Sequence, residues 1–555
     1  MSKLHLNLLA LLIGVLLLFA LEGALRIAGI PPYSHMMKLL RLTSIVPLTR
    51  GLPQPHRQVR PFEPPVFRLH TDSSGVRIYS TSEEQSGLRI HTLSFPAKKG
   101  PSTRRIFCFG ESSMYGEPYP NNVATLARWM QEFFDRTCED HKFEVINCGV
   151  AGIDSYGIAE FARECLQYEP DTFVVFCGHN ERLRRSVAAR LAFLRRSRTG
   201  HKIRCALASS SRIYAVMARL VTKIAAPAPP EGEEALAALA ALSPEQRELQ
   251  DSVINFEFDC NLQEVADIAR EHSVGLVFAA APPNYRDWPE FRWRFGPDIG
   301  RERQRELMTK FWQALCLLDQ HKPQDAASAL KELIGTAPSL SAFYFWLGRS
   351  YEEMGDAALA KKNLFKAIDT ASCALPGMTL GLRDTMEKVA ARNSAPFVDL
   401  FSAFEAHSPN GLVGNNLIMD YCHPSLSAHK IAAKAILQKC QASGLIPPKC
   451  SLDRFDEIMA KFTDDDLSWL PSSVSEGQKE YWPRAKPEMT AQAYMSRVAE
   501  WFGDYFRATD EFGQSVAWFR KGLELAPDQA SLQSKLDEVC RLMSEAAVQS
   551  DKSGG

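Results

Sequence analysis

Between residues 105 and 400, short apolar runs alternate with helical patterns, and this alternation limits the possible fold more than any other feature. The runs are compactly apolar, as expected for strands that are covered on both faces. They are Arg105–Phe109, Phe143–Cys148, Thr172–Cys177, Gly275–Ala280 and Pro396–Leu400. Helical patterns lie between them, for example over Thr125–Asp135 and Tyr156–Gln167. The alternation predicts a doubly wound α/β domain with a parallel sheet and right-handed crossovers.

The length of the chain exceeds what one hydrophobic core can serve. Its 555 residues indicate two to four domains. Apolar residues make up 45% and charged residues 23%, which is an ordinary globular composition. The formal net charge is -1. Nucleic-acid binding depends on neutralising phosphates, so we expect no nucleic-acid partner.

The N-terminus carries a targeting pattern. Lys3 precedes an apolar run, Leu8–Leu21, which is short for a spanning helix, because such a helix needs about 20 residues. Extended to Ile30, the segment would span a membrane, with Lys3 on the inner side. An uncleaved signal anchor over residues 1–30 is the preferred interpretation, and a cleaved signal peptide is the alternative. Either one predicts an extracytoplasmic location for the remaining chain.

Residues 31–100 are rich in proline and are predicted to form a stalk, with a short hairpin between Gly75 and Ile90. The sheet domain is predicted over residues 101–440. Two helical insertions, at about 182–250 and 300–375, interrupt it. A helical region over 441–555 follows.

The second insertion contains a repeat with a period of 34 residues. Four pairs match in size or apolar character: Ala314 and Gly348, Leu317 and Tyr351, Ala326 and Ala360, Leu330 and Leu364. A fifth pair, Pro338 and Ser372, breaks the pattern. The segment WLGRSYEEMGDAALAKKNLFKAI resembles a tetratricopeptide repeat, and a third copy covers Trp501–Asp528. Repeats of this kind usually bind peptides or other proteins, so a protein partner is one expectation, although the pattern itself does not require one. A generic helical hairpin, required by packing alone, is the alternative.

A polar turn follows the first predicted strand. The stretch FCFGESSMYG places Ser112 and Ser113 where a strand gives way to a helix. A serine hydroxyl is a weak nucleophile until a base takes its proton. The stretch DYCHPSLSAH offers that base, because His423 lies three residues after Asp420 and the turn can bring carboxylate and imidazole together. A helix cap and a polar loop histidine are the alternatives without catalysis.

Two further turns follow predicted strands. NCGVAG ends at Gly152, whose backbone N–H can approach a substrate closely because glycine has no side chain. FCGHNE contains Asn180, whose amide can donate into the same crevice. An ordinary turn and a capping asparagine are the alternatives. All four turns lie beyond the C-terminal ends of strands, or after the last one, where open α/β sheets bind their ligands.

The four blocks GESS, NCGVAG, GHNE and DYCH stand in the order found in the SGNH (GDSL-type) hydrolase superfamily, which the chain resembles over about residues 105–440, insertions excluded. The resemblance implies a flavodoxin-like three-layer α/β/α sandwich. Members of this superfamily are esterases, lipases, carbohydrate O-acetylesterases and some acyltransferases.

The resemblance also implies a role for each matching position. Ser112 would be the nucleophile and one backbone oxyanion donor. Gly152 would supply the second backbone donor and Asn180 the side-chain donor. His423 would be the base, oriented by Asp420.

One residue departs from the pattern of the superfamily. Glu111 stands where an aspartate is usual, at a position that is mainly structural there, so we expect little loss of activity. Ser113 adjoins the candidate nucleophile. We choose Ser112 because it directly follows the acid.

The cysteines do not suggest a metal site. Thirteen is an odd number, so at least one cysteine is unpaired. The sequence has no CxxC motif and no Cys/His cluster with zinc spacing, so we predict no metal and no cofactor, and the sequence leaves the disulfide pairing open.

The sequence therefore predicts a membrane-anchored, extracytoplasmic serine esterase that forms an acyl-enzyme at Ser112. Its substrate would be an acyl ester, with glycan-linked acyl groups as one class. An O-acyltransferase with the same triad is the first alternative. A non-catalytic scaffold whose repeats recruit a partner is the second.

Overall fold

The structure is a computed structural model. It describes residues 3–30, 65–81, 90–184, 199–217 in part, 244–291, 295–371 except 297, 377–484 and 486–553. The disulfide and all contacts below belong to these residues.

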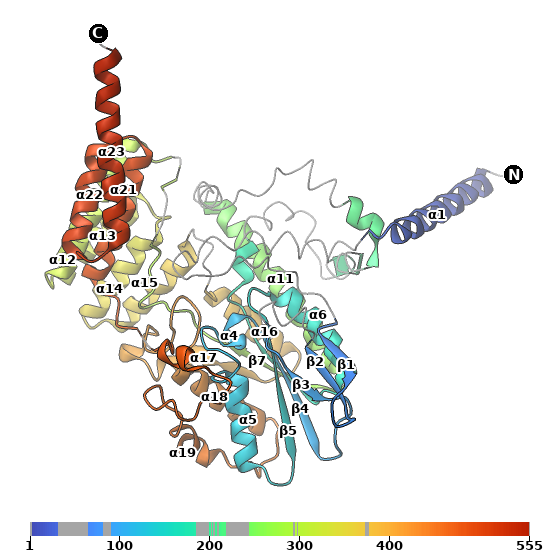
Figure 1. Cartoon of the computed structure of the whole chain (residues 1–555). Helices are drawn as coiled ribbons and strands as arrows, with labels where there is room; N and C mark the ends of the chain where they lie inside the picture. Colours follow the sequence, from blue (N-terminus) through green and yellow to red (C-terminus); the bar gives the residue numbers. More distant parts are fainter. Residues whose placement is uncertain are drawn as a thin grey trace.

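A five-stranded sheet forms the centre of the larger domain (Figure 1). Its strands are β4 (Thr103–Gly110), β5 (Lys142–Gly149), β6 (Thr172–Phe176), β7 (Gly275–Ala280) and β8 (Phe397–Asp399). The spatial order is β5-β4-β6-β7-β8, and every neighbouring pair is parallel. This is the 2-1-3-4-5 order of flavodoxin-like sheets. All five predicted strands are confirmed, and so is the mixed α/β class with a parallel sheet.

Helices cover the sheet in two groups. On one face, α5 (Leu126–Thr137) and α18 (Leu426–Ala442) contact each other and the strands. The other group is α6 (Ser155–Cys165), α11 (Pro244–Glu271) and α16 (Leu380–Arg392). Four short α-helices also belong to this domain: α4 (Ser112–Tyr115), α17 (Leu400–Glu405), α19 (Phe455–Met459) and α20 (Glu476–Glu480).

The core lies between the sheet and these helices and is rich in aromatic side chains. Every residue of β6 is buried. Phe173 of this strand packs edge-on against Phe109 of β4, with ring centroids 5.1 Å apart. A strand that is covered on both faces appears in the sequence as a continuous apolar run. The five strands could be predicted for that reason.

Residues 65–81 and 90–100 fold onto this domain, in part of the region predicted to be a stalk; residues 82–89 lie outside the described residues. They form an antiparallel sheet of β1 (Phe67–Thr71), β2 (Arg77–Thr81) and β3 (Ser94–Pro96). The hairpin expected between Gly75 and Ile90 therefore begins earlier and has a third strand. Fully buried Arg105 joins the two sheets, because its guanidinium donates to the carbonyls of Pro96 and Tyr168. Residues 31–64 lie outside the described residues.

A second region consists of antiparallel helices, here named the helical array. They are α12 (Arg301–Asp319), α13 (Pro323–Thr336), α14 (Ser341–Glu353), α15 (Ala357–Thr370), α21 (Ala491–Ala508), α22 (Phe512–Leu525) and α23 (Ala530–Ser553). Consecutive helices pack together within α12–α15 and within α21–α23, and α21 packs against α12, so the insertion and the C-terminal region form one stack (Figure 1). Trp312 and Trp518 meet across this junction, with ring centroids 5.0 Å apart. Assignment to the tetratricopeptide class stays a prediction.

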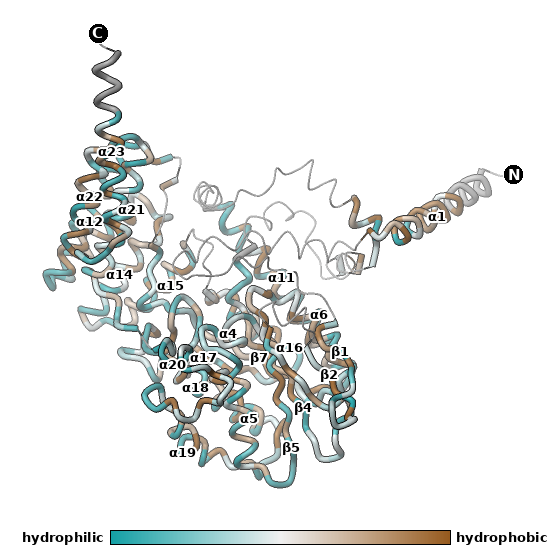
Figure 2. The backbone as a smooth tube through the Cα atoms, viewed as in Figure 1, coloured by the Kyte–Doolittle hydropathy of each residue, from teal (hydrophilic) through white to brown (hydrophobic). Residues whose placement is uncertain are grey.

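The N-terminal helix α1 (Lys3–Ile27) stands apart from the sheet domain, and Figure 2 shows its apolar character. The large apolar side chains between Leu12 and Phe19 are exposed. Within the described part of the chain, we find no helix with both the length and the apolarity needed to cross a membrane. The predicted transmembrane helix is therefore not supported.

One disulfide joins Cys138, after α5, to Cys450, after α18. It ties together the two helices that cover one face of the sheet. Among the described cysteines nine are free, which agrees with the expectation of unpaired thiols.

Candidate active site

The strand β4 ends in a turn with no room for a side chain at Gly110. A Cβ there would lie 2.3 Å from the Phe176 carbonyl oxygen and 2.5 Å from the Met114 Cβ. The short helix α4 starts directly after this turn with Ser112, and Gly116, which has φ +98°, caps its C-terminal end. Close packing against the end of β6 thus holds the serine at the C-terminal edge of the sheet.

The two neighbouring serines have different partners. The Ser112 Oγ lies 2.7 Å from the His423 Nε2, although the two residues are 311 positions apart. The Ser113 hydroxyl donates instead to the Cys422 carbonyl oxygen at 3.0 Å. Only Ser112 therefore contacts the imidazole, and Ser113 fixes the helix against the histidine loop.

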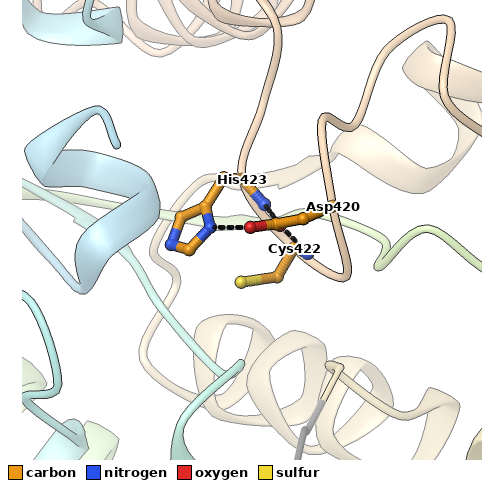
Figure 3. A group of neighbouring side chains, drawn as sticks. All are labelled: Asp420, Cys422 and His423. Carbon is orange, nitrogen blue, oxygen red and sulfur yellow. Dashed lines mark hydrogen bonds and ion pairs between the residues drawn. The ribbon is translucent and has the colours of Figure 1, made fainter. Parts of the chain in front are cut away.

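Asp420 orients the imidazole from the opposite side (Figure 3). Its Oδ2 lies 2.6 Å from the His423 Nδ1. Its Oδ1 accepts the backbone N–H groups of Cys422 and His423, both at 2.9 Å. This turn selects the tautomer that carries a proton on Nδ1, and it leaves the lone pair of Nε2 free to accept the Ser112 proton.

The charges of this pair shift both pKa values. Burial acts to raise the pKa of Asp420, but the nearby His423 and the N–H donors outweigh it and lower the pKa to about 2. Burial acts to lower the pKa of His423, but the Asp420 charge outweighs it and places the pKa well above its ordinary value. The carboxylate thus favours the imidazolium that would form during proton transfer.

Asp420, Cys422 and His423 also carry three metal-ligand atoms within 4.8 Å of one another. The fit to a metal is poor. Two ligands of a tetrahedral zinc, each about 2.0–2.2 Å from it, lie roughly 3.3 Å apart. The Nδ1–Oδ2 separation of 2.6 Å is shorter and suits a hydrogen bond. We therefore interpret the group as an acid–histidine pair.

The two predicted oxyanion residues lie on loops that touch. The Asn180 side-chain nitrogen donates to the Ile153 carbonyl oxygen at 2.8 Å, one residue after Gly152. Gly152 has φ +81°, which favours glycine. In the described part of the chain, the backbone N–H groups of Ser112 and Gly152 donate to no other protein group. They are free to donate to an oxyanion.

Glu111, at a position expected to be mainly structural, holds a specific loop in place. Its buried carboxylate accepts three backbone N–H groups, from Gly178 at 3.2 Å, His179 at 2.9 Å and Asn180 at 2.9 Å. It therefore connects the nucleophile turn to the loop that carries the oxyanion amide. Burial raises the pKa of Glu111 to about 7 against the pull of these donors. The sequence signal for this role is the acidic residue directly before the serine.

Glu181, the last residue of the GHNE block, fixes the same loop to the start of α6. Its carboxylate accepts the Ser155 backbone N–H at 2.7 Å and the Ser155 hydroxyl at 2.9 Å. Burial, followed by the nearby Glu111, raises the pKa of Glu181 to about 8. Sequence reasoning assigned it no role.

Glu117 was also missed. Its Oε2 lies 3.6 Å from the His423 Nε2, the nitrogen that also faces Ser112. Its side chain is 33% exposed, so this carboxylate stands at the open side of the pair. No sequence pattern singles it out, because its approach to the histidine bridges more than 300 residues.

Together, the carboxyl edge of the sheet brings a serine, a histidine and an aspartate into one hydrogen-bonded chain, with amide donors on the adjoining loops. This arrangement can activate a hydroxyl nucleophile and stabilise a negative charge beside it.

Comparisons with known proteins add little to this geometry. No family model matches the chain, and no curated protein matches it. An alpha/beta hydrolase enzyme from the metagenome of Lake Arreo, Spain, is 13% identical with a TM-score of 0.27, covering 62% of this chain and 96% of its own. A GDSL-like lipase from Bacteroides thetaiotaomicron is 11% identical with a TM-score of 0.24, covering 61% and 89%. Similarities this weak carry no argument.

Proposed function

We propose that this chain is a serine ester hydrolase of the SGNH type, with Ser112 as nucleophile, His423 as base and Asp420 as the acid that orients it. One observation carries the proposal: the unbroken hydrogen-bonded chain from the Ser112 Oγ through both imidazole nitrogens to the Asp420 carboxylate.

The first half of the reaction acylates the serine. The Ser112 Oγ attacks the ester carbonyl carbon while its proton passes to the His423 Nε2, and the carbonyl oxygen becomes an oxyanion. The C–O bond to the alcohol then breaks. The imidazolium returns the proton to the leaving alkoxide, which departs as an alcohol.

The second half releases the acid. Water attacks the acyl carbon and gives one proton to His423, and the resulting tetrahedral intermediate collapses. The Ser112 Oγ leaves and takes that proton back, so the free enzyme is restored. The Ser112 and Gly152 N–H groups and the Asn180 amide would donate to the oxyanion in both halves.

The proposed substrate is an acyl ester, with O-acylated glycans as one class. A membrane anchor over residues 1–30, an extracytoplasmic location and a protein partner for the helical array stay predictions.

Labelling with a fluorophosphonate tests the nucleophile. We expect the wild type and Ser113→Ala to be labelled and Ser112→Ala to remain unlabelled. Ser113→Ala is the matched control, because it removes the neighbouring hydroxyl, which contacts a backbone carbonyl instead of the base. An unlabelled but folded wild type would favour the scaffold interpretation, and labelled Ser112→Ala would mean that another serine reacts.

Product analysis separates the hydrolase from the acyltransferase, since both share the acyl-enzyme. With an ester donor and a glycan acceptor, a hydrolase releases free acid at a rate that is independent of the acceptor. Acyl transfer to the glycan would replace the hydrolase proposal and keep the triad.

A further inference from the structure

The second carboxylate at His423 suggests a basis for substrate selection. The Asp420 and Glu117 carboxylates lie next to different nitrogens of the His423 imidazole. Asp420 contacts Nδ1 and is held by two backbone N–H groups. Glu117 faces Nε2 at 3.6 Å, on the side where the chemistry would occur.

The backbone of Glu117 is fixed to the nucleophile residue itself. The N–H groups of Gly116 and Glu117 both donate to the Ser112 carbonyl oxygen, at 2.8 and 3.1 Å. The turn that ends α4 therefore sets the position of the Glu117 backbone relative to the nucleophile. Within the described residues, this carboxylate makes no other ion pair.

The leaving group must pass beside this charge. A group that receives a proton from the His423 Nε2 comes within about 2.6–3.2 Å of that nitrogen. The Glu117 Oε2 is 3.6 Å from the same atom. The alcohol part of an ester in the proposed reaction therefore lies next to a carboxylate that is partly exposed and partly desolvated.

We propose that Glu117 selects the alcohol part of the substrate: it accepts a hydrogen bond from neutral hydroxyl-bearing alcohols, such as sugars, and repels alcohols that carry a negative charge near the ester. This inference rests on the proposed function. Asp420 would orient the base, and Glu117 would select substrates by the charge of the leaving alcohol.

A pair of esters with the same acyl group tests this inference on the full chain. Methyl 4-acetoxybenzoate and 4-acetoxybenzoate differ by one negative charge on the leaving phenol. We expect the wild type to favour the neutral ester in kcat/KM. In Glu117→Gln the neutral-to-anionic ratio should fall by about 3- to 10-fold, which is the effect of removing one nearby like charge in a partly solvated site. Glu117→Asp should retain part of the preference.

Glu139→Gln is the matched control, because it removes the same charge from an exposed residue between α5 and β5, at the other edge of the sheet. It should leave the ratio unchanged. An equal ratio in the wild type and Glu117→Gln overturns the inference alone, provided that Ser112→Ala abolishes turnover of both esters. Full turnover by Ser112→Ala, or none by the wild type, overturns the proposed function and this inference with it.

Discussion

The carboxyl edge of the sheet and the helical array join distant parts of the chain in different ways. At the edge, single atoms meet: the Ser112 Oγ contacts the His423 Nε2 across 311 residues. In the array, whole faces meet: α21 packs on α12, and the Trp312 ring of α12 contacts the Trp518 ring of α22. Apolar packing tolerates many side chains of suitable volume, but a proton relay requires particular atoms at particular distances.

This difference predicts that substitutions at the edge change turnover more than stability, and that substitutions in the array do the reverse. His423→Ala, Asn180→Ala and Gly503→Ala test this difference, in order of the expected effect, and Glu181→Gln tests an exception, because Glu181 lies at the edge but affects stability.

Replacing the base should have the largest effect. We expect His423→Ala to lose on the order of 10^3 or more in kcat for an acyl ester, because the Ser112 proton then has no acceptor. The melting temperature should change little in comparison. Steady-state kinetics and thermal unfolding of the same preparation check both. Near-normal turnover would contradict the triad.

Removing one oxyanion donor should cost less. Asn180→Ala should lower kcat by about 10^2 to 10^3. Part of that loss can come from loop movement, because the Asn180 amide also donates to the Ile153 carbonyl. Fluorophosphonate labelling of the variant would still proceed, more slowly, if the nucleophile and base are intact. An unchanged kcat would remove Asn180 from the oxyanion site.

Filling a tight contact in the array should affect stability alone. A Cβ on Gly503 of α21 would lie 2.3 Å from the Phe519 ring of α22. We expect Gly503→Ala to lower the free energy of unfolding by about 1–3 kcal/mol, as overpacking does. Gly513→Ala is the matched control in the array, because its Cβ meets nothing within 4 Å. A loss of kcat per folded molecule in Gly503→Ala would show that the two regions are coupled.

The buried Glu181 should make the edge sensitive to pH. Its pKa is about 8 in the folded chain, above the ordinary 4.5, so the folded state keeps a proton that the unfolded state loses. The free energy of unfolding should therefore fall as pH rises from about 4.5 to 8. Glu181→Gln should remove about 2 kcal/mol of that fall between pH 5 and 7. Denaturant titrations at both pH values check this, and an unchanged pH dependence would contradict it.

Much of the sheet domain could be predicted because its signals are local. Each strand is an apolar run, because helices cover both faces of the sheet. Each proposed site residue lies in the turn after such a run or in the loop after the last strand. The pairing of Cys138 with Cys450 could not be predicted, since spacing alone does not reveal which cysteines meet. Nor could the packing of β1–β3 onto Arg105, which depends on contacts between separate sheets.

By itself, the sequence determined the five parallel strands and the polar turns at the strand ends, because periodicity and turn chemistry act over a few residues. Only the tertiary structure decided that Ser112 faces the base while Ser113 faces a carbonyl. It also decided that Glu111 holds the Asn180 loop and that Glu117 stands beside the imidazole. Strand order and loop packing set these contacts. They bring atoms within 4 Å of each other that belong to residues far apart in the sequence, and the sequence separation does not reveal that they meet.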